Sequence, residues 1–302
     1  MANTFYKFAV NSAPQQIKII DTINEEAPIV SEIPVLPTSS GMQHSYQKIT
    51  ATTGPGLVEL DGALTTISAD TKLETINLSI FGGVMKKGVD TVAILGGKSK
   101  AFANELMIAS KSFAQELEKS VLYNSLRTYS INNGNYIKAG GSASVNRSII
   151  CVTWSEGEIN GLYNPEFYGA GKVLDVIDLT PSAPVLNQNT SALEWQYAVK
   201  GNFGMQLANE SLVSSIVNID TTNAPNLFLA SMIDEVIVNA RARGKNSMLI
   251  MHPTMASYLS TFKTTQYYSV LDSEINRLVA FWNGVRIVES YNMLNKTETT
   301  VS

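Results

Sequence analysis

Residues 43–81, QHSYQKITATTGPGLVELDGALTTISADTKLETINLSIF, stand shortly before a long amphipathic segment, residues 98–124. Two runs within the first stretch, 44–52 and 71–81, alternate well enough to be strands, and the Gly- and Pro-containing sequence between them is typical of a loop. A lone two-stranded hairpin is marginal in water, and this one has little apolar content of its own. We therefore expect residues 43–81 to lie on another surface, and we expect that surface to belong to a second copy of the chain.

The segment that follows predicts one long helix, from Lys98 to about Asn124. Its apolar residues recur at spacings of three and four, which marks a buried stripe: Phe102, Leu106, Ala109, Phe113, Leu117 and Val121. The polar residues are expected largely off that stripe: Lys100, Asn104, Lys111, Glu118 and Lys119. At 1.5 Å per residue, such a helix is about 40 Å long.

Strands dominate the middle of the chain. The apolar run at 147–154 is typical of a strand, and Asn160-Gly161 after it predicts a type I′ turn. Residues 193–219 are expected to form two long strands.

The last eighty residues alternate between helices and strands. A helix is predicted over 226–243, with Gly244 as the glycine that follows its end. Residues 247–251, SMLIM, indicate a buried strand, and a short helix opens at Pro253. A hairpin turns at Asn283-Gly284. The prolines before residue 42 favour an extended arm with one short helix at about 15–24.

The composition narrows the class of protein. Of the 302 residues, 44% are hydrophobic, which is enough for a sizeable core, whereas only 16% are charged, against about 25% in ordinary soluble domains. Interface cores are depleted of charge, so a weakly charged surface suits burial against other proteins. The net charge of −4 argues against a dedicated nucleic-acid binder, which needs a basic stripe. The single cysteine, Cys151, allows no disulfide within the chain and is expected to be buried.

Neither a signal peptide nor a membrane span is predicted. The N-terminal sequence MANTFYKFAV lacks a basic region followed by an apolar one, and no run approaches the roughly 18 apolar residues of a span. We expect a soluble chain that is made in the cytoplasm and has no membrane partner.

No constellation of residues predicts catalysis, a cofactor or a metal site. Residues 96–99, Gly-Gly-Lys-Ser, follow an expected strand and precede a helix, as in a phosphate-binding loop. That motif needs glycine where this chain has Val92, which cannot adopt the glycine conformations. The two histidines, His44 and His252, are far apart, and the carboxylates are scattered. We expect no enzyme, and keep a nucleotide-binding enzyme as an alternative of another class.

Arg241 and Arg243 form a basic cluster at the end of the helix predicted over 226–243. Cations are favourable there for the helix dipole alone. A functional interpretation pairs them with Glu59 or Asp61 of a neighbouring copy, so these four residues are the candidate intersubunit contacts.

In this order of segments the chain resembles the major capsid proteins of tailed bacteriophages, which have the Hong Kong 97-type fold, and within them a podophage-like branch. Residues 43–81 resemble the family's E-loop, and the helix through FAQELEKSVLYNS resembles its spine helix. MLIMHPTMASYLS and FWNGVRIVES are similar to its axial domain. The resemblance implies an α+β fold with four parts: an N-terminal arm (1–42), an E-loop (43–81), a peripheral domain (82–145 and 190–222) and an axial domain (146–189 and 223–302).

The resemblance also implies what such a chain does and with what. Copies assemble as pentamers and hexamers into an icosahedral shell in the bacterial cytoplasm, and each E-loop overlies a neighbour. The shell encloses double-stranded DNA without sequence-specific binding. Implied partners are a portal, a decoration protein and a scaffolding protein, here expected as a separate chain. An encapsulin-like compartment shell is the alternative within the same fold.

Overall fold

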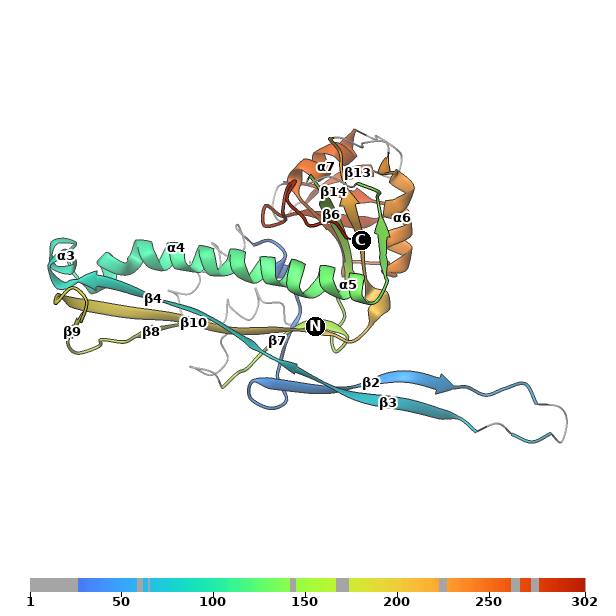
Figure 1. Ribbon diagram of the computed structural model, residues 1–302, viewed down its shortest axis with the longest axis horizontal. Helices are drawn as coiled ribbons and strands as arrows, with labels where there is room; N and C mark the ends of the chain where they lie inside the picture. Colours follow the sequence, from blue (N-terminus) through green and yellow to red (C-terminus); the bar gives the residue numbers. More distant parts are fainter. Residues whose placement is uncertain are drawn as a thin grey trace.

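The computed structural model describes residues 27–58, 62–64, 66–141, 145–166, 174–222, 227–261, 267–272 and 277–301. Three parts are visible in Figure 1: a long helix lying over a sheet, a second sheet with helices at one end of it, and a projecting hairpin. The fold is α+β, as the sequence predicts.

The first half of the described chain holds these elements: η1 (Val30–Glu32), β1 (Val35–Pro37), β2 (Gln43–Thr53), β3 (Ser68–Asn77), β4 (Ser79–Gly88), α3 (Val89–Ile94), α4 (Lys98–Lys119), η2 (Ser120–Arg127), α5 (Thr128–Asn132), β5 (Tyr136–Lys138) and β6 (Arg147–Thr153). The second half holds these: β7 (Ile159–Tyr163), β8 (Leu174–Asp178), β9 (Val185–Leu186), β10 (Leu193–Leu207), η3 (Glu210–Leu212), β11 (Val213–Ile219), α6 (Ala230–Asn239), β12 (Ser247–Met251), α7 (Pro253–Ser260), β13 (Tyr267–Asp272), β14 (Arg277–Trp282) and β15 (Val285–Glu289).

The predicted long helix is confirmed, and it extends further than expected. Helix α4 continues without a break through the π-helical turn η2 into α5, so the backbone stays helical to Asn132 instead of Asn124. Phe113, Leu117 and Val121 of the predicted stripe are buried in the largest apolar cluster. Glu118, which we expected off that stripe, is fully buried as well, so that prediction was wrong.

Two larger sheets and the hairpin make up the strand content. The first sheet is built around the fifteen-residue β10, which pairs with β4, β7, β8 and β9 along its length. Helices α3 and α4 contact β4 of this sheet. The second sheet runs in the order β13-β14-β15-β12-β6-β11-β5, with a separate apolar cluster between it and α6 and α7.

The division into an arm, an E-loop and two domains stays a prediction, and the sheets cross its boundaries. Strands β7 and β8, which fall in the range expected for the axial domain, pair with β10 in the first sheet. Strand β11, which falls in the range expected for the peripheral domain, pairs with β6 in the second. The expected helix at 15–24 lies outside the described residues.

Three local predictions were wrong. Residues 89–94 form a helix, not a strand, because Val92 packs with Ala101 and Phe102 of the next helix. Asn160 and Gly161 lie inside strand β7, not in a turn, because Gly161 lets the ring of Phe203 pack against its backbone. Helix α6 ends at Asn239, four residues before the predicted end.

Other local predictions are confirmed. Strand β12 is buried throughout, α7 opens at Pro253, and the 283–284 turn has positive φ at both residues, as a type I′ turn requires. Cys151 is buried. No helix of the described residues has the length and apolar character needed to span a membrane.

Candidate intersubunit surfaces

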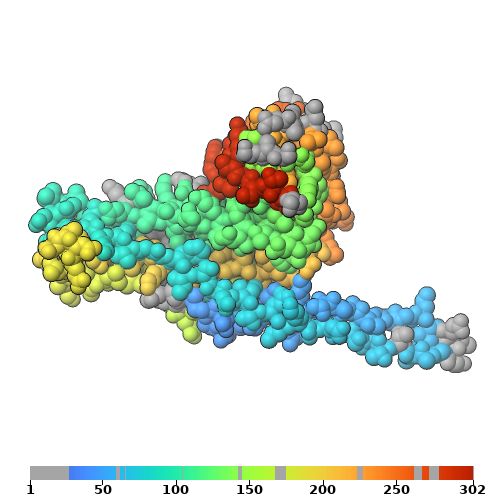
Figure 2. Space-filling model, viewed as in Figure 1, coloured from blue at the N-terminus to red at the C-terminus, as the bar shows by residue number. Residues whose placement is uncertain are grey.

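The β2–β3 hairpin projects away from the rest of the subunit (Figures 1 and 2). Both strands pair only with one another, and nearly all of their side chains are exposed or half-exposed. Several of the exposed residues are apolar: Ile49, Leu57, Val58, Leu64, Ile67 and Leu73. Leu57 is fully exposed, and Leu64 is 87% exposed. Apolar side chains on an element without a core indicate a surface that is covered in the assembled state.

The hairpin is anchored only at its root. Lys48 Nζ forms an ion pair at 2.5 Å with Glu210 of η3, and the Leu78 N–H donates to the Met42 carbonyl at 2.9 Å. Leu78 is buried on Gly204 of β10, where a Cβ would lie 2.6 Å from Leu78 Cδ2. The Tyr46 hydroxyl donates to Glu74 across the two strands at 2.7 Å. Most side chains of β2 and β3 are exposed to solvent.

The Gly-Gly-Lys-Ser sequence lies at the opposite end of the first sheet, and its lysine, Lys98, binds acceptors of its own subunit. Lys98 Nζ donates to both carboxylate oxygens of Asp178, at 2.7 and 2.6 Å, and to the Thr180 carbonyl at 2.6 Å. It also lies 4.3 Å from the ring centroid of Trp195. Burial by itself raises the pKa of Asp178, but the hydrogen bonds from Lys98 and the Thr180 N–H, together with the Lys98 charge, outweigh it and the pKa is lowered.

This geometry is that of a structural joint and not of a phosphate site. The segment before Gly96 is a helix, Val92 is buried, and the Lys98 ammonium has its acceptors already. A nucleotide-binding role for residues 96–99 therefore has no support in the fold.

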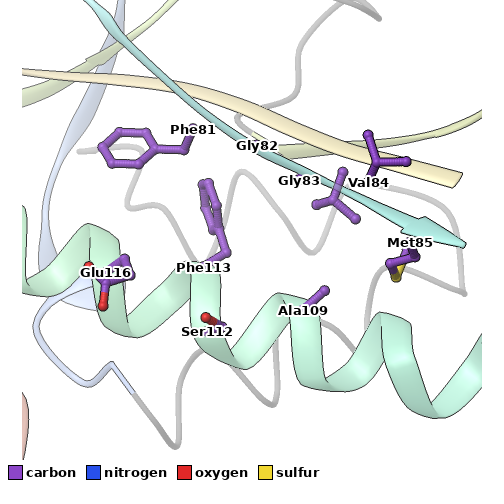
Figure 3. A pocket seen from close by; sticks show the side chains of 10 residues that line it. Phe81, Gly82, Gly83, Val84, Met85, Ala109, Ser112, Phe113 and Glu116 are labelled. Atoms are coloured by element: carbon purple, nitrogen blue, oxygen red, sulfur yellow. The ribbon is translucent and has the colours of Figure 1, made fainter. Parts of the chain in front are cut away.

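A groove of about 330 Å³ lies between strand β4 and helix α4 (Figure 3). Phe81 and Phe113 lie edge-to-face at one end of it, with ring centroids 5.8 Å apart, and Val84, Met85 and Ala109 continue the apolar lining. Its only ionisable lining residue is Glu116, which pairs with Lys119 at 3.0 Å. Such a lining can hold an apolar side chain, but it offers no set of groups for catalysis.

Two buried glutamates join distant parts of the chain. Glu118 accepts hydrogen bonds from the Ile29 N–H at 2.9 Å, from the Ser290 hydroxyl and from the Asn292 amide. Glu298 accepts from the Ser148 hydroxyl and from the Tyr123 hydroxyl, and its carboxylate lies 3.4 Å from Arg127 Nε.

Burial raises the pKa of both glutamates, although their hydrogen bonds act in the opposite direction. Through its hydrogen bonds, Glu118 of α4 connects Ile29 and the loop at Ser290 to the long helix. Glu298 connects the last described residues to Tyr123 and Arg127 of η2.

The four predicted contact residues fall in two groups. Glu59 and Asp61 lie outside the described residues. Arg241 and Arg243 are exposed at the end of α6, on the other sheet from the hairpin root. Whether these residues pair between copies stays a prediction.

The described part of the chain contains no group of three or more His, Cys, Asp or Glu side chains that could hold a metal. Burial raises the pKa of the Cys151 thiol far above its ordinary value, which leaves it unreactive.

The exposed end at α3 and β9 and the two buried glutamates are the features that sequence reasoning missed. Ile94 and Leu186 read as ordinary apolar residues, and only the fold shows that they are exposed. One sequence feature pointed to burial of Glu118: it directly follows Leu117, a residue of the apolar stripe, and so lies at the edge of that stripe.

Comparison with known proteins agrees with this picture. The family model of major capsid protein GP7 matches residues 90–302, which is well over half of the chain. No curated protein matches. Among solved structures, the bacteriophage Epsilon15 structure has a chain that is 17% identical with a TM-score of 0.59, and the match covers 86% of this chain and 85% of that one. The bacteriophage JBD30 capsid is 10% identical with a TM-score of 0.55, covering 85% and 88%.

These structural likenesses establish the fold, and the family match establishes the role. The α+β architecture, with its projecting hairpin and long helix, is the Hong Kong 97-type capsid fold. The chain belongs to the major capsid protein GP7 family and is a subunit of the shell of a bacteriophage virion.

Proposed function

We propose that copies of this chain form pentamers and hexamers in an icosahedral shell, with the hairpin of each copy lying on a neighbouring copy. The observation that carries the proposal is the set of exposed apolar side chains on β2, β3 and the described residues of the loop between them, which have no core of their own. Burying one leucine-sized side chain contributes about 1.5–3 kcal/mol. Many such contacts, each modest, add up through a closed lattice.

Removal of the hairpin tests this proposal. Residues 45–75 are replaced by an Asn-Gly turn, which leaves Met42, Leu78 and the whole of β4 in place. The variant should fold as a monomer with a melting temperature close to that of the parent, because the deleted part of the hairpin is tied to the body by one partly exposed ion pair, Lys48–Glu210, and by few other contacts. It should form no shells in electron micrographs. Normal shells from this variant would overturn the proposal.

We further propose that the shell encloses double-stranded DNA without sequence-specific binding. The support is the net charge of −4, since a surface that does not attract phosphate lets packed DNA move. In an electrophoretic mobility assay at physiological salt, the purified protein should retard no DNA fragment. Tight, salt-sensitive binding would contradict this. An encapsulin-like compartment would instead hold an enzyme cargo, so the contents of purified particles separate the two functions.

The remaining parts of the proposal concern partners and place. Assembly in the bacterial cytoplasm with a scaffolding protein, a portal and a decoration protein is the expectation for a shell subunit of this fold. We propose no enzymatic activity, because Lys98, the most suggestive residue of the sequence, is held by Asp178 and Thr180.

A further inference from the structure

The sequence contains three Asn-Gly pairs, at 133–134, 160–161 and 283–284. In such a pair the backbone nitrogen of the glycine can attack the side-chain amide of the asparagine, because glycine has no side chain that shields this nitrogen. The three pairs are alike in sequence, and the fold places each in a different environment. Exposure, and the hydrogen bond of the glycine N–H, therefore decide which pair can react.

The pair at 160–161 is protected within strand β7. Both residues are buried, and the Gly161 N–H donates to the Pro34 carbonyl at 2.8 Å. The Asn160 side chain is held as well, because it accepts from the Gly157 N–H and donates to the Gly161 carbonyl, each at 3.0 Å. Neither the attacking nitrogen nor the amide is free to move in the folded chain.

The pair at 133–134 is exposed after the end of α5, but both of its reacting groups are bonded. The Gly134 N–H donates to the Ile131 carbonyl at 3.1 Å. The Asn133 amide donates to the Tyr129 carbonyl at 3.0 Å. Attack at this site requires that the last helical turn opens first.

The pair at 283–284 forms the exposed turn between β14 and β15, with φ of 49° and 84°. No hydrogen bond within the described part of the chain holds the Gly284 N–H. The Asn283 amide donates to Asp234 Oδ1 of α6 at 3.2 Å, whereas the Trp282 Nε1–H donates to the same oxygen at 2.9 Å. The attacking nitrogen is thus free, and the amide is held by the longer of these two bonds.

We propose that Asn283 is a site of spontaneous deamidation and that its product weakens the contact between the β14–β15 turn and helix α6. The Gly284 nitrogen gives its proton to solvent and attacks Asn283 Cγ. The N–Cγ bond forms, the Cγ–Nδ2 bond breaks, and Nδ2 takes up a proton and leaves as ammonia. Water then opens the cyclic succinimide to aspartate or isoaspartate. The sum is the hydrolysis of an amide, in which nothing is oxidised or reduced.

The product alters a contact of the second apolar cluster. A carboxylate at position 283 cannot donate to Asp234, and it brings a second negative charge beside that side chain. Trp282, which bonds the same oxygen of Asp234, is fully buried in this cluster. Isoaspartate also lengthens the backbone within a two-residue turn, which the type I′ geometry does not accommodate.

Peptide mapping by mass spectrometry tests the site. The full-length protein is incubated in mildly alkaline buffer, and the deamidated fraction at each Asn-Gly pair is followed with time. In the folded protein Asn283 should react about tenfold faster than Asn133, whose attacking nitrogen must first break a hydrogen bond. Asn160 should stay intact. In urea the three sites should react at similar rates, because each asparagine is followed by glycine.

Two results of the mapping would overturn the proposed site. One is deamidation of Asn133 or Asn160 in the folded protein at the rate of Asn283 or above it. The other is an order of rates that persists unchanged in urea, since flanking sequence and not the fold would then set it.

The variant N283D isolates the effect of the new charge. Asp-Gly suits a type I′ turn as Asn-Gly does, so the turn is kept. At low salt N283D should melt at a lower temperature than the parent, and D234N should restore the loss in the N283D background, because the amide at 234 can donate to the new carboxylate. D234N alone is the control and should change little, since its side-chain oxygen still accepts from Trp282 and Asn283. Equal melting temperatures of N283D and the parent, or no rescue by D234N, would overturn the proposed effect on the contact with α6.

Discussion

At the scale of single residues, Arg241 occupies a position that usually belongs to glycine. Helix α6 ends in a Schellman motif: the Ala242 N–H donates to the Ile237 carbonyl, and the Arg241 N–H to the Val238 carbonyl. Arg241 is therefore the residue after the cap and has φ of 47°, in the left-handed region. The sequence pointed to Gly244 for this role, because glycine is the usual residue there and arginine gives no such signal.

Replacing this arginine with glycine should stabilise the subunit. Arg241→Gly removes the steric conflict of a Cβ in the left-handed region and should raise the free energy of unfolding by about 1 kcal/mol. Urea denaturation of the unassembled protein measures it. The control is Arg243→Gly, two residues on and without a positive φ, which should lower stability by about 0.5–1 kcal/mol. A loss of stability in Arg241→Gly would show that the arginine side chain makes a contact worth more than the strain.

The two buried glutamates should make stability depend on pH above the ordinary glutamate pKa. Burial raises the pKa of Glu118 and of Glu298 in the folded state. Between the ordinary value and the raised one, the folded state holds more protons than the unfolded state, so stability falls as pH rises through that window and is level above it. E118Q/E298Q should lack this fall in a series of urea denaturations, and E298Q alone should lack part of it.

The carboxylates with lowered pKa act in a different window. Burial lowers the pKa of His252, which gives a rise of stability with pH below its ordinary value, but His252 is present in parent and variant alike and cancels in their difference. A hydrogen bond from Tyr46 lowers the pKa of Glu74, and that of Asp178 is lowered as well. Their contribution is lost only as pH falls below their ordinary values. An unchanged slope in E118Q/E298Q above those values would contradict the assignment.

At the scale of elements, sequence patterns predicted what local periodicity controls. The α4 stripe, the buried strand β12 and the turn at Asn283 each carry a short-range signal, and each is confirmed. Predictions from sequence patterns were wrong where packing between different segments determines the secondary structure. Residues 89–94 have an apolar run that suits a strand, but contact with Ala101 and Phe102 makes them a helix. Gly161 suits a turn, but the ring of Phe203 holds it in a strand.

The exposed end at α3 and β9 could not be predicted for the same reason. Its residues come from separate segments, and nothing in the sequence distinguishes an exposed Ile94 from a buried one. The hairpin could be predicted, because two alternating runs of low apolar content flank a Gly- and Pro-containing stretch.

The root of the hairpin depends on the absence of a side chain at Gly204. A Cβ there would lie 2.6 Å from Leu78 Cδ2 and 3.7 Å from the next nearest heavy atom. Gly204→Ala should therefore displace Leu78 and lower the free energy of unfolding by about 1–3 kcal/mol. In an L78A background the same substitution should add little further loss, because the conflict has gone.

Gly83→Ala is the control for the root. Gly83 lies in β4, the strand that leads away from the root, and nothing lies within 4 Å of a Cβ built there. Its effect should stay within about 0.5 kcal/mol. Equal losses from both alanines, or full additivity of G204A with L78A, would show that the hairpin root is not set by this fit.

At the scale of the whole molecule, the subunit combines a body that holds two large apolar clusters with the projecting β2–β3 hairpin, whose described residues belong to neither. The clusters bury residues of β6 and β12 on both of their faces, whereas the described part of the hairpin has only its root contacts. Local stability follows the number of buried apolar contacts, so these parts should open with very different free energies. On the proposed function, assembly adds contacts to the hairpin and few to the body's interior.

Hydrogen exchange should therefore separate the two parts, and only the hairpin should change on assembly. In the unassembled subunit, amides of β2 and β3 should exchange within seconds, because a two-stranded hairpin with open edges is marginally stable. Amides of β6 and β12 should stay protected for far longer. In shells the hairpin amides should slow by at least about tenfold, whereas those of β6 and β12 should not change, which provides the internal control. Hairpin amides that are already protected in the lone subunit, or that exchange equally fast in the shell, would show that contacts with a neighbouring copy do not stabilise the hairpin.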